Sequence, residues 1–210
     1  MPENRSLPYR HIAAALALGA ALSAAALHVR RSARRRELIR DACAAPAPDE
    51  ARAWTADGYI KDQDALRSCV YRTMPASING CGPVAAYNLR RRAGQDAAFA
   101  DVLDELDAMH PFRAPGPTLM RVMRRYLRRY LPGGREARGR RAAVAAAARS
   151  EMGVFRYLEQ GVPHFVAYFR APGGFRFFNV SDDTEDAVLP MASFAAAHLR
   201  GGSVKLIWWA

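Results

Sequence analysis

The feature that most restricts the fold of this chain is a change in the spacing of its apolar residues. In the middle of the chain, apolar side chains recur every three or four positions, which predicts amphipathic helices over 97–110 and 118–131. A further helix is expected over 82–92, with Pro83 in its first turn and Gly94 after its end. Further on, two aromatic and β-branched runs flank Pro172-Gly173-Gly174, a pattern typical of a β-hairpin. A helix is expected after this hairpin, and the apolar run 203–209 predicts a last strand. Helices that precede strands predict an α+β fold and not an alternating βαβ order.

The length of 210 residues suits one globular domain with an extension. We expect an N-terminal transmembrane anchor with a basic flank over 1–36, a linker over 37–56 and the folded domain over 57–210. The linker contains the sequence APAP and lacks an apolar period, which predicts an extended tether. The net charge of +11 comes mainly from two arginine-rich stretches, 1–40 and 113–141, so it does not indicate a uniformly cationic surface.

The predicted anchor is Ile12 to Val29, a stretch of 18 residues without a formal charge. Its length is close to the minimum for a membrane span, although its many alanines make it only weakly hydrophobic. A dense arginine cluster follows it, and the positive-inside bias then places the domain of a single-pass protein on the cytoplasmic side. The alternatives are a cleaved signal peptide, with the domain exported, and an alanine-rich helix that does not enter a membrane.

Three cysteines, Cys43, Cys69 and Cys81, are too few for a disulfide scaffold. An exported domain would allow a bridge between Cys43 and Cys69 and leave Cys81 free, whereas a cytoplasmic domain would keep three thiols. The spacing of cysteines and histidines matches no zinc site. We therefore expect neither a metal nor an organic cofactor.

Cys81 lies between two glycines at the predicted start of a helix, in the stretch NGCGPVAAYN, and Pro83 suits the first helical turn. The N-terminus of a helix carries partial positive charge and free N–H groups, which stabilise a thiolate and can also bind an oxyanion. Gly80 and Gly82 leave room for the backbone of a substrate. The same pattern also fits a small buried residue at a helix start, so a catalytic interpretation needs a partner for the thiol.

A thiol nucleophile needs a base, and we expect His164 in this role because it begins an aromatic strand that would support it rigidly. His110 precedes a proline in a loop, and His198 falls late in a predicted helix. A hairpin loop with an even number of residues places His164 on the same sheet face as Asn179. An odd loop places Asp182 there instead. We take Asn179 as the residue that orients the imidazole, with Asp182 as the alternative.

The stretch NGCGPVAAYN and the later PHFVAYF and GGFRFFNVSDD together resemble the papain-like cysteine peptidases. The nearest resemblance is to the branch of bacteriocin-processing, double-glycine leader peptidases and their uncharacterised bacterial relatives, and it covers roughly residues 75–180. It implies a papain-like fold and a peptide or acyl substrate. It also implies that Cys81 is the nucleophile, His164 the general base and Asn179 the orienting residue.

This family usually completes its oxyanion hole with a glutamine about six residues before the cysteine, where this chain has Pro75. Asn79 and Ser77 are the candidates to replace that glutamine. The resemblance favours a membrane-tethered cysteine hydrolase that acts on a peptide-like substrate through a Cys-His-Asn triad. The alternative is a catalytically weak or inactive module of the same fold that acts as a basic membrane-surface or partner-binding domain.

One predicted helix carries an arginine stripe opposite its apolar face, formed by Arg121, Arg124, Arg125, Arg128 and Arg129. Such a stripe can contact anionic lipid, which would be consistent with a membrane anchor. Charge runs of this kind are also common on solvated helix faces. No aromatic-interleaved motif accompanies the stripe, so we do not expect a nucleic-acid partner.

Overall fold

The computed structural model describes residue 37 and residues 48–111, 116–180, 188–200 and 203–210. The chain divides into two units, Met1–Asp41 and Ala42–Ala210, and the fold described below is that of the second unit. The predicted anchor, Ile12 to Val29, lies outside the described residues. Within the ranges given above, no helix is both long and apolar enough to cross a bilayer.

The second unit has an α+β fold, which confirms the predicted class. Its helical elements are η1 (Pro48–Ala53), α2 (Ala76–Asn79), α3 (Cys81–Arg92), α4 (Phe99–Met109), α5 (Met120–Tyr130), α6 (Arg140–Ala147) and α7 (Met191–His198). Its strands are β1 (Val70–Tyr71), β2 (Met74–Pro75), β3 (Arg135–Arg138), β4 (Met152–Glu159), β5 (Val162–Ala171), β6 (Gly174–Phe178), β7 (Val188–Leu189) and β8 (Lys205–Trp209).

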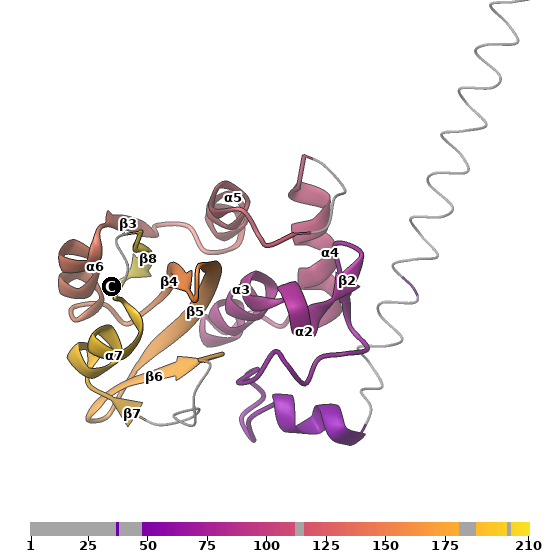
Figure 1. The fold of residues 1–210 in the computed structure, drawn as a ribbon, viewed down its shortest axis with the longest axis horizontal. Coiled ribbons are helices and arrows are strands. Elements are labelled where there is room, and N and C mark those ends of the chain that lie inside the picture. Colours follow the sequence, from indigo (N-terminus) through magenta and orange to yellow (C-terminus); the bar gives the residue numbers. More distant parts are fainter. Residues whose placement is uncertain (1–36, 38–47, 112–115, 181–187, 201–202) are drawn as a thin grey trace, which may run out of the picture. The chain divides into compact units, whose positions relative to one another are not determined.

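The six-stranded sheet has the order β3-β8-β4-β5-β6-β7, and every neighbouring pair is antiparallel. Helix α3 packs along β5 on one side of this sheet, while α6 and α7 lie on the other side (Figure 1). Strand β5 is apolar on both faces because both are covered. Its Val166 and Tyr168 join a core cluster with Phe194 of α7, whereas Phe169 contacts Tyr59 on the α3 side.

The predicted hairpin is confirmed as β5 and β6, which pair from Ala171 opposite Gly174. The two residues between them, Pro172 and Gly173, form an even loop, and Gly173 adopts a left-handed φ of 84°. This even loop sets the register in which His164 and Asn179 are predicted to share a sheet face. A second hairpin joins β4 to β5 and places His164 opposite Tyr157.

The described part of the predicted linker, residues 48–56, packs against the domain. Ala53 is fully buried, and the ring of Trp54 meets the edge of Tyr87 at 5.5 Å. The carboxylate of Glu50, also buried, accepts hydrogen bonds from the backbone N–H and the hydroxyl of Ser68, each at 2.6 Å. These contacts make residues 48–56 part of the folded unit and not a free tether.

The cysteines differ in redox state. Cys69 is buried and disulfide-bonded, whereas Cys81 is buried and free. The third cysteine of the sequence, Cys43, lies outside the described residues. The thiol available for chemistry in the described part of the domain is therefore that of Cys81.

Candidate active site

Cys81 is the first residue of α3, as the sequence predicts for the start of that helix. Gly80 separates α3 from the short helix α2 and donates its N–H to the carbonyl of Ala76. As the first residue of α3, Cys81 has a backbone N–H without an acceptor inside that helix, and the carbonyl of Ser77 accepts a bond from Gln63 Nε2. The cysteine therefore combines its thiol with a backbone N–H at a helix N-terminus.

His164 lies near the start of β5, and its side chain is only 13% exposed. Its Nε2 lies 2.7 Å from the backbone carbonyl of Asn179. A carbonyl can only accept, so Nε2 carries the hydrogen, and Nδ1 is the nitrogen left to face the thiol. Burial alone would lower the pKa of His164, but the hydrogen bond with Cys81, the Asn179 carbonyl and the Glu159 carboxylate together outweigh it and raise the pKa.

The structure brings Cys81 and His164 together from the two halves of the domain. The Cys81 Sγ lies 4.0 Å from the carbonyl oxygen of Pro163, the residue that precedes His164. This separation is too long for a strong hydrogen bond, so the side-chain hydrogen bond with His164 is the contact that pairs the thiol with a base. The two side chains thus have the arrangement that a nucleophile and its base require.

Asn179 contacts His164 through its backbone and not through its side chain. The residue follows the last position of β6 and adopts a left-handed φ of 65°. Its N–H donates to the Lys61 carbonyl at 2.9 Å, its Nδ2 donates to Gln63 Oε1 at 2.8 Å, and its Oδ1 accepts the Gln63 N–H at 2.9 Å. These bonds aim the Asn179 carbonyl at the imidazole, which differs from the side-chain contact expected from the sequence.

Gln63 is the site residue that sequence reasoning missed. It lies in the irregular segment before β1, 116 positions from Asn179, and no motif surrounds it in the sequence. Its side-chain amide reaches both Asn179 Nδ2 and the carbonyl of Ser77, at 2.8 and 3.3 Å. Gln63 therefore connects the α2–α3 turn, which carries Cys81, to the segment that supports His164.

The side chain predicted to replace the oxyanion glutamine, Asn79, is committed to the backbone. Its Nδ2 donates to the carbonyls of Tyr71 and Gly116, at 2.9 and 3.4 Å. Ser77, the other candidate, lines the same pocket as Cys81 and offers its carbonyl to Gln63. Asp182, the alternative orienting residue, lies outside the described residues.

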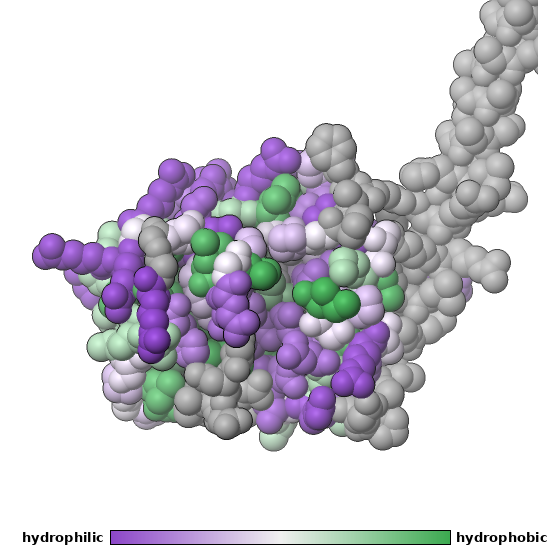
Figure 2. Space-filling model, in the orientation of Figure 1, coloured by the Kyte–Doolittle hydropathy of each residue, from purple (hydrophilic) through white to green (hydrophobic). Residues whose placement is uncertain are grey.

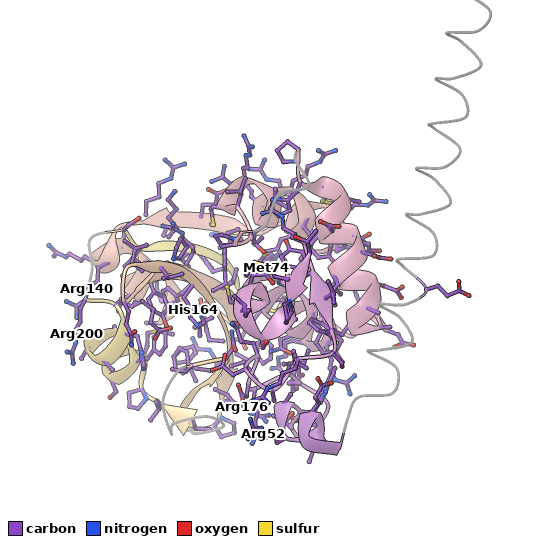
Figure 3. All side chains as sticks on the ribbon, turned by 45° about the vertical axis from the view of Figure 1, so that its right-hand side comes forward. Arg52, Met74, Arg140, His164, Arg176 and Arg200 are labelled. Atoms are coloured by element: carbon purple, nitrogen blue, oxygen red, sulfur yellow. The ribbon has the colours of Figure 1, made fainter. Side chains whose placement is uncertain are left out.

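Cys81 and His164 open into a pocket of about 870 Å³. Gln63, Asn179 and Met74 also line it, and Met74 and His164 are labelled in Figure 3. Two aliphatic side chains on its wall, Ile78 of α2 and Val162 of β5, are each 62% exposed. Figure 2 shows a hydrophobic spot at the place that α2 occupies in Figure 1. Apolar surface beside the Cys81 thiol is suited to a ligand that buries it.

Charged side chains also line this pocket, namely Lys61, Asp62, Asp64 and Glu159. The pKa of Asp64 is raised, first by burial and then by repulsion from Asp62. Within the described residues, no group of three or more histidine, cysteine or acidic side chains has the arrangement of a metal site.

Comparisons with protein-family models, with curated proteins and with solved structures find no match to this chain. The functional interpretation consequently depends on the geometry around Cys81 and on the chemistry of the residues that line its pocket.

Proposed function

We propose that the chain is a cysteine hydrolase of papain-like type that cleaves or transfers the acyl group of a peptide-like substrate. The observation that carries this proposal is the position of the His164 ring. It interacts with a free thiol at a helix start, while its opposite nitrogen donates to a fixed carbonyl. A buried cysteine without a catalytic role would not need an imidazole held in one tautomer.

In the proposed reaction, the Cys81 thiolate attacks the substrate carbonyl carbon, and the π electrons of that bond move to the oxygen. The resulting tetrahedral intermediate collapses when the His164 imidazolium gives its Nδ1 proton to the leaving nitrogen or oxygen, which leaves a thioester on Cys81. Water then attacks the thioester while His164 takes a proton from it. The acid product leaves, and the thiolate–imidazolium pair is restored.

The oxyanion would be stabilised by donors already present at the start of α3. The N–H of Cys81 is one of the first N–H groups of α3, which have no acceptor inside the helix. For the second donor we propose Gln63 Nε2 in place of Asn79. This amide carries two hydrogens, and the contact that it makes with the Ser77 carbonyl uses one of them.

The proposal is tested by the pH dependence of alkylation. Iodoacetamide is applied to the full chain and to the His164→Ala variant between about pH 4 and 10, and the adduct on Cys81 is measured by mass spectrometry. We expect wild-type Cys81 to react well below the range of an ordinary thiol, about pH 8.5, and the variant to lose this reactivity. The variants Cys81→Ser and Cys81→Ala, which lack the thiol, serve as negative controls for the adduct.

The proposal is excluded if the alkylation rate of Cys81 has the same pH dependence in wild type and in His164→Ala and rises only near pH 8.5, as for a free thiol. Cys81 would then not be an activated nucleophile. That outcome would support the alternative of a non-catalytic module. A peptide probe with a thiol-reactive epoxide provides a second measurement, because its reaction with Cys81 requires an accessible substrate pocket as well as an activated thiol.

We propose in addition that the basic face of α5 and β3 contacts anionic lipid. Arg121, Arg125, Arg128 and Arg129 are exposed on α5, and the strand beside it adds further exposed arginines, Arg135 and Arg138. Glu136 pairs with Arg124 and lies 3.6 Å from Arg128, so it offsets only part of this charge. Clustered guanidinium groups favour phosphate-bearing surfaces.

The disulfide at Cys69 favours an oxidising compartment for the domain. We therefore propose the exported alternative over the cytoplasmic one that the arginine flank suggests. Attachment of a membrane-impermeant thiol reagent to a cysteine introduced at an exposed position, such as Arg67, would report the side of the membrane in intact cells. Labelling only after lysis would favour the cytoplasmic side.

A further inference from the structure

We propose that Glu159 is a positioning residue for His164, acting beside the Asn179 carbonyl to hold the imidazole and to stabilise its charged form. Its Oε2 lies 3.6 Å from His164 Nε2, and its Oε1 lies 3.9 Å from Nδ1 of His198 on α7. The catalytic meaning of this inference depends on the proposed function of Cys81, although the contact itself does not.

The β4–β5 hairpin fixes the position of Glu159. Gln160 and Gly161 form its two-residue turn, and their φ values of 48° and 85° are both positive, as a type I′ turn requires. The register pairs Glu159 with Val162 and Tyr157 with His164. Residues two apart share a face, so Glu159 is the diagonal neighbour of His164 on that face. A rigid turn thus delivers the carboxylate to the imidazole.

The partly buried surroundings of the Glu159 carboxylate strengthen its interaction with His164. The Glu159 side chain is 21% exposed and that of His164 13%, so solvent screens their interaction less than it would at the surface. The ring of His198, 9% exposed, closes the other side of Glu159 and packs on Phe194 at 4.9 Å. Glu159 is therefore confined between two imidazoles, which limits its rotamers as a positioning role requires.

Several groups surround His164 and can influence its pKa. The thiol of Cys81 comes from α3, Glu159 comes from β4, and the Asn179 carbonyl follows β6. Asp64 acts from the loop before β1 at longer range. Lys61 and Asp62 line the same pocket. Of these groups, the Asn179 carbonyl and the Glu159 carboxylate lie within 3.6 Å of His164 Nε2, and only the carboxylate is charged.

The first measurement observes His164 directly. The full chain is labelled with ¹³C-histidine in a Cys81→Ala background, and the His164 signal is assigned by its absence in His164→Asn. We expect Glu159→Gln to lower the pKa of His164 by about one unit, because an opposite charge at this range raises an imidazole pKa by that order. Glu159→Asp keeps the charge but withdraws it by one methylene, so its shift should be smaller. Asp64→Asn is the matched control, which removes a carboxylate from the same pocket at longer range.

The second measurement follows alkylation with the native thiol present. At neutral pH the pair shares one proton, and loss of the Glu159 charge favours the thiol–imidazole form over the thiolate–imidazolium form. Glu159→Gln should therefore react more slowly than wild type near pH 7, by up to about tenfold for a one-unit shift of His164, whereas above about pH 10 the thiolate forms without His164 and the two proteins should react alike. Glu159→Asp should recover much of this rate.

Two results would overturn the inference: a His164 titration unchanged by Glu159→Gln, or an equal shift caused by Asp64→Asn. If Glu159→Gln does not fold, Glu159→Ala takes its place, because it removes the same charge and an unchanged His164 pKa in that variant also counts against the contact. Failure of the proposed hydrolase looks different. Cys81 would then react as an ordinary thiol in the wild type and in His164→Ala, whatever Glu159 does to the imidazole.

Discussion

Gln63 and Asn179 hold each other through two hydrogen bonds, one from the Gln63 N–H to Asn179 Oδ1 and one from Asn179 Nδ2 to Gln63 Oε1. The pair explains how a residue in a left-handed conformation can present its carbonyl to His164 at 2.7 Å. The side chain fixes the segment, and the backbone makes the contact with the imidazole. The asparagine side chain therefore positions the carbonyl of residue 179 and does not itself contact His164.

Replacement of the Asn179 side chain should therefore weaken the site without abolishing it. We expect Asn179→Ala to lower the free energy of unfolding by roughly 1–3 kcal/mol, because it loses two hydrogen bonds and places alanine at a positive φ. The carbonyl acceptor remains, so alkylation of Cys81 should slow less than in His164→Ala. Urea unfolding and the iodoacetamide rate at neutral pH measure the two effects. Asn179→Gly separates them, since glycine tolerates the backbone conformation but cannot bind Gln63.

A double-mutant cycle with Gln63→Ala tests the coupling. The Gln63 backbone N–H survives this substitution, so the cycle isolates the bond between Asn179 Nδ2 and Gln63 Oε1. We expect an interaction energy of about 0.5–3 kcal/mol, the range for residues in direct contact. Strict additivity of the two single substitutions would show that the pair does not act as a unit.

Gly82 should be needed for the approach of α3 to Thr118. A Cβ at position 82 would lie 2.1 Å from Thr118 Oγ1 and 2.4 Å from Thr118 Cβ. Thr118 is buried, and its hydroxyl hydrogen-bonds Tyr71 Oη at 3.0 Å, so it has little freedom to move. We expect Gly82→Ala to destabilise the fold by about 1–3 kcal/mol, as overpacking usually does, and to slow alkylation of Cys81 by displacing the start of the helix.

Gly133→Ala is a suitable control for this substitution. Gly133 has a φ of 86° with no neighbour within 4 Å of an added Cβ, so its replacement adds backbone strain without a clash. It should cost some stability and leave the reactivity of Cys81 unchanged. The expectation is wrong if Gly82→Ala has the same free energy of unfolding and the same Cys81 alkylation rate as wild type. In that case α3 and Thr118 can move apart without cost, and packing does not require the glycine.

Local patterns in the sequence were sufficient for the elements that hold Cys81 and His164. Helix α3 has a proline in its first turn and a glycine soon after its end, and the β5–β6 hairpin has its turn residues next to two aromatic runs. Strand β3 gave no such signal because it is an edge strand whose residues, REAR, are mostly exposed. The stretch 132–141 is therefore predicted from its sequence to be a basic loop.

The contacts that complete the site could not be read from the sequence. Gln63 belongs to an irregular segment, whose path depends on packing and not on a periodic pattern. The side chain of Asn179 binds Gln63, and its carbonyl contacts His164. This orientation depends on the positive φ of Asn179, the residue just after β6. Parity of the hairpin placed Asn179 beside His164 but could not specify which of its atoms would face the imidazole.

The proposed lipid contact predicts salt-sensitive binding to anionic vesicles. The variant Arg125→Glu with Arg129→Glu reverses two charges on the exposed side of α5, and Arg52→Glu with Arg67→Glu reverses two exposed charges elsewhere. Each arginine near an anionic surface contributes about 1 kcal/mol, so the first pair should weaken association with phosphatidylglycerol vesicles strongly at low salt.

Co-sedimentation of the full chain measures this effect, with phosphatidylcholine vesicles and high salt as references. Both references report the binding that does not depend on charge. Equal loss in the two double variants would indicate that net charge alone is responsible, and no loss in either would remove the basic face as a lipid contact.

His110 should make the stability of the domain depend on pH. The residue is buried, and its Nε2 lies 2.9 Å from Tyr71 Oη. Burial, together with the charges of Arg72 and Arg121, lowers the pKa of His110 to about 4 from an ordinary value of 6.5. Between these values the unfolded chain binds the proton and the folded chain does not. Stability therefore rises with pH through this window and is fully present above about 6.5.

We expect wild type to lose up to about 2 kcal/mol more than His110→Gln between pH 7.5 and 5, as a depressed imidazole pKa implies. Urea unfolding of both proteins at the two pH values measures the difference. The raised pKa of His164 has the opposite sign, since it stabilises the fold at low pH, but it is present in both proteins and cancels. Parallel pH dependence in the two proteins would show that His110 titrates alike in the folded and unfolded chain.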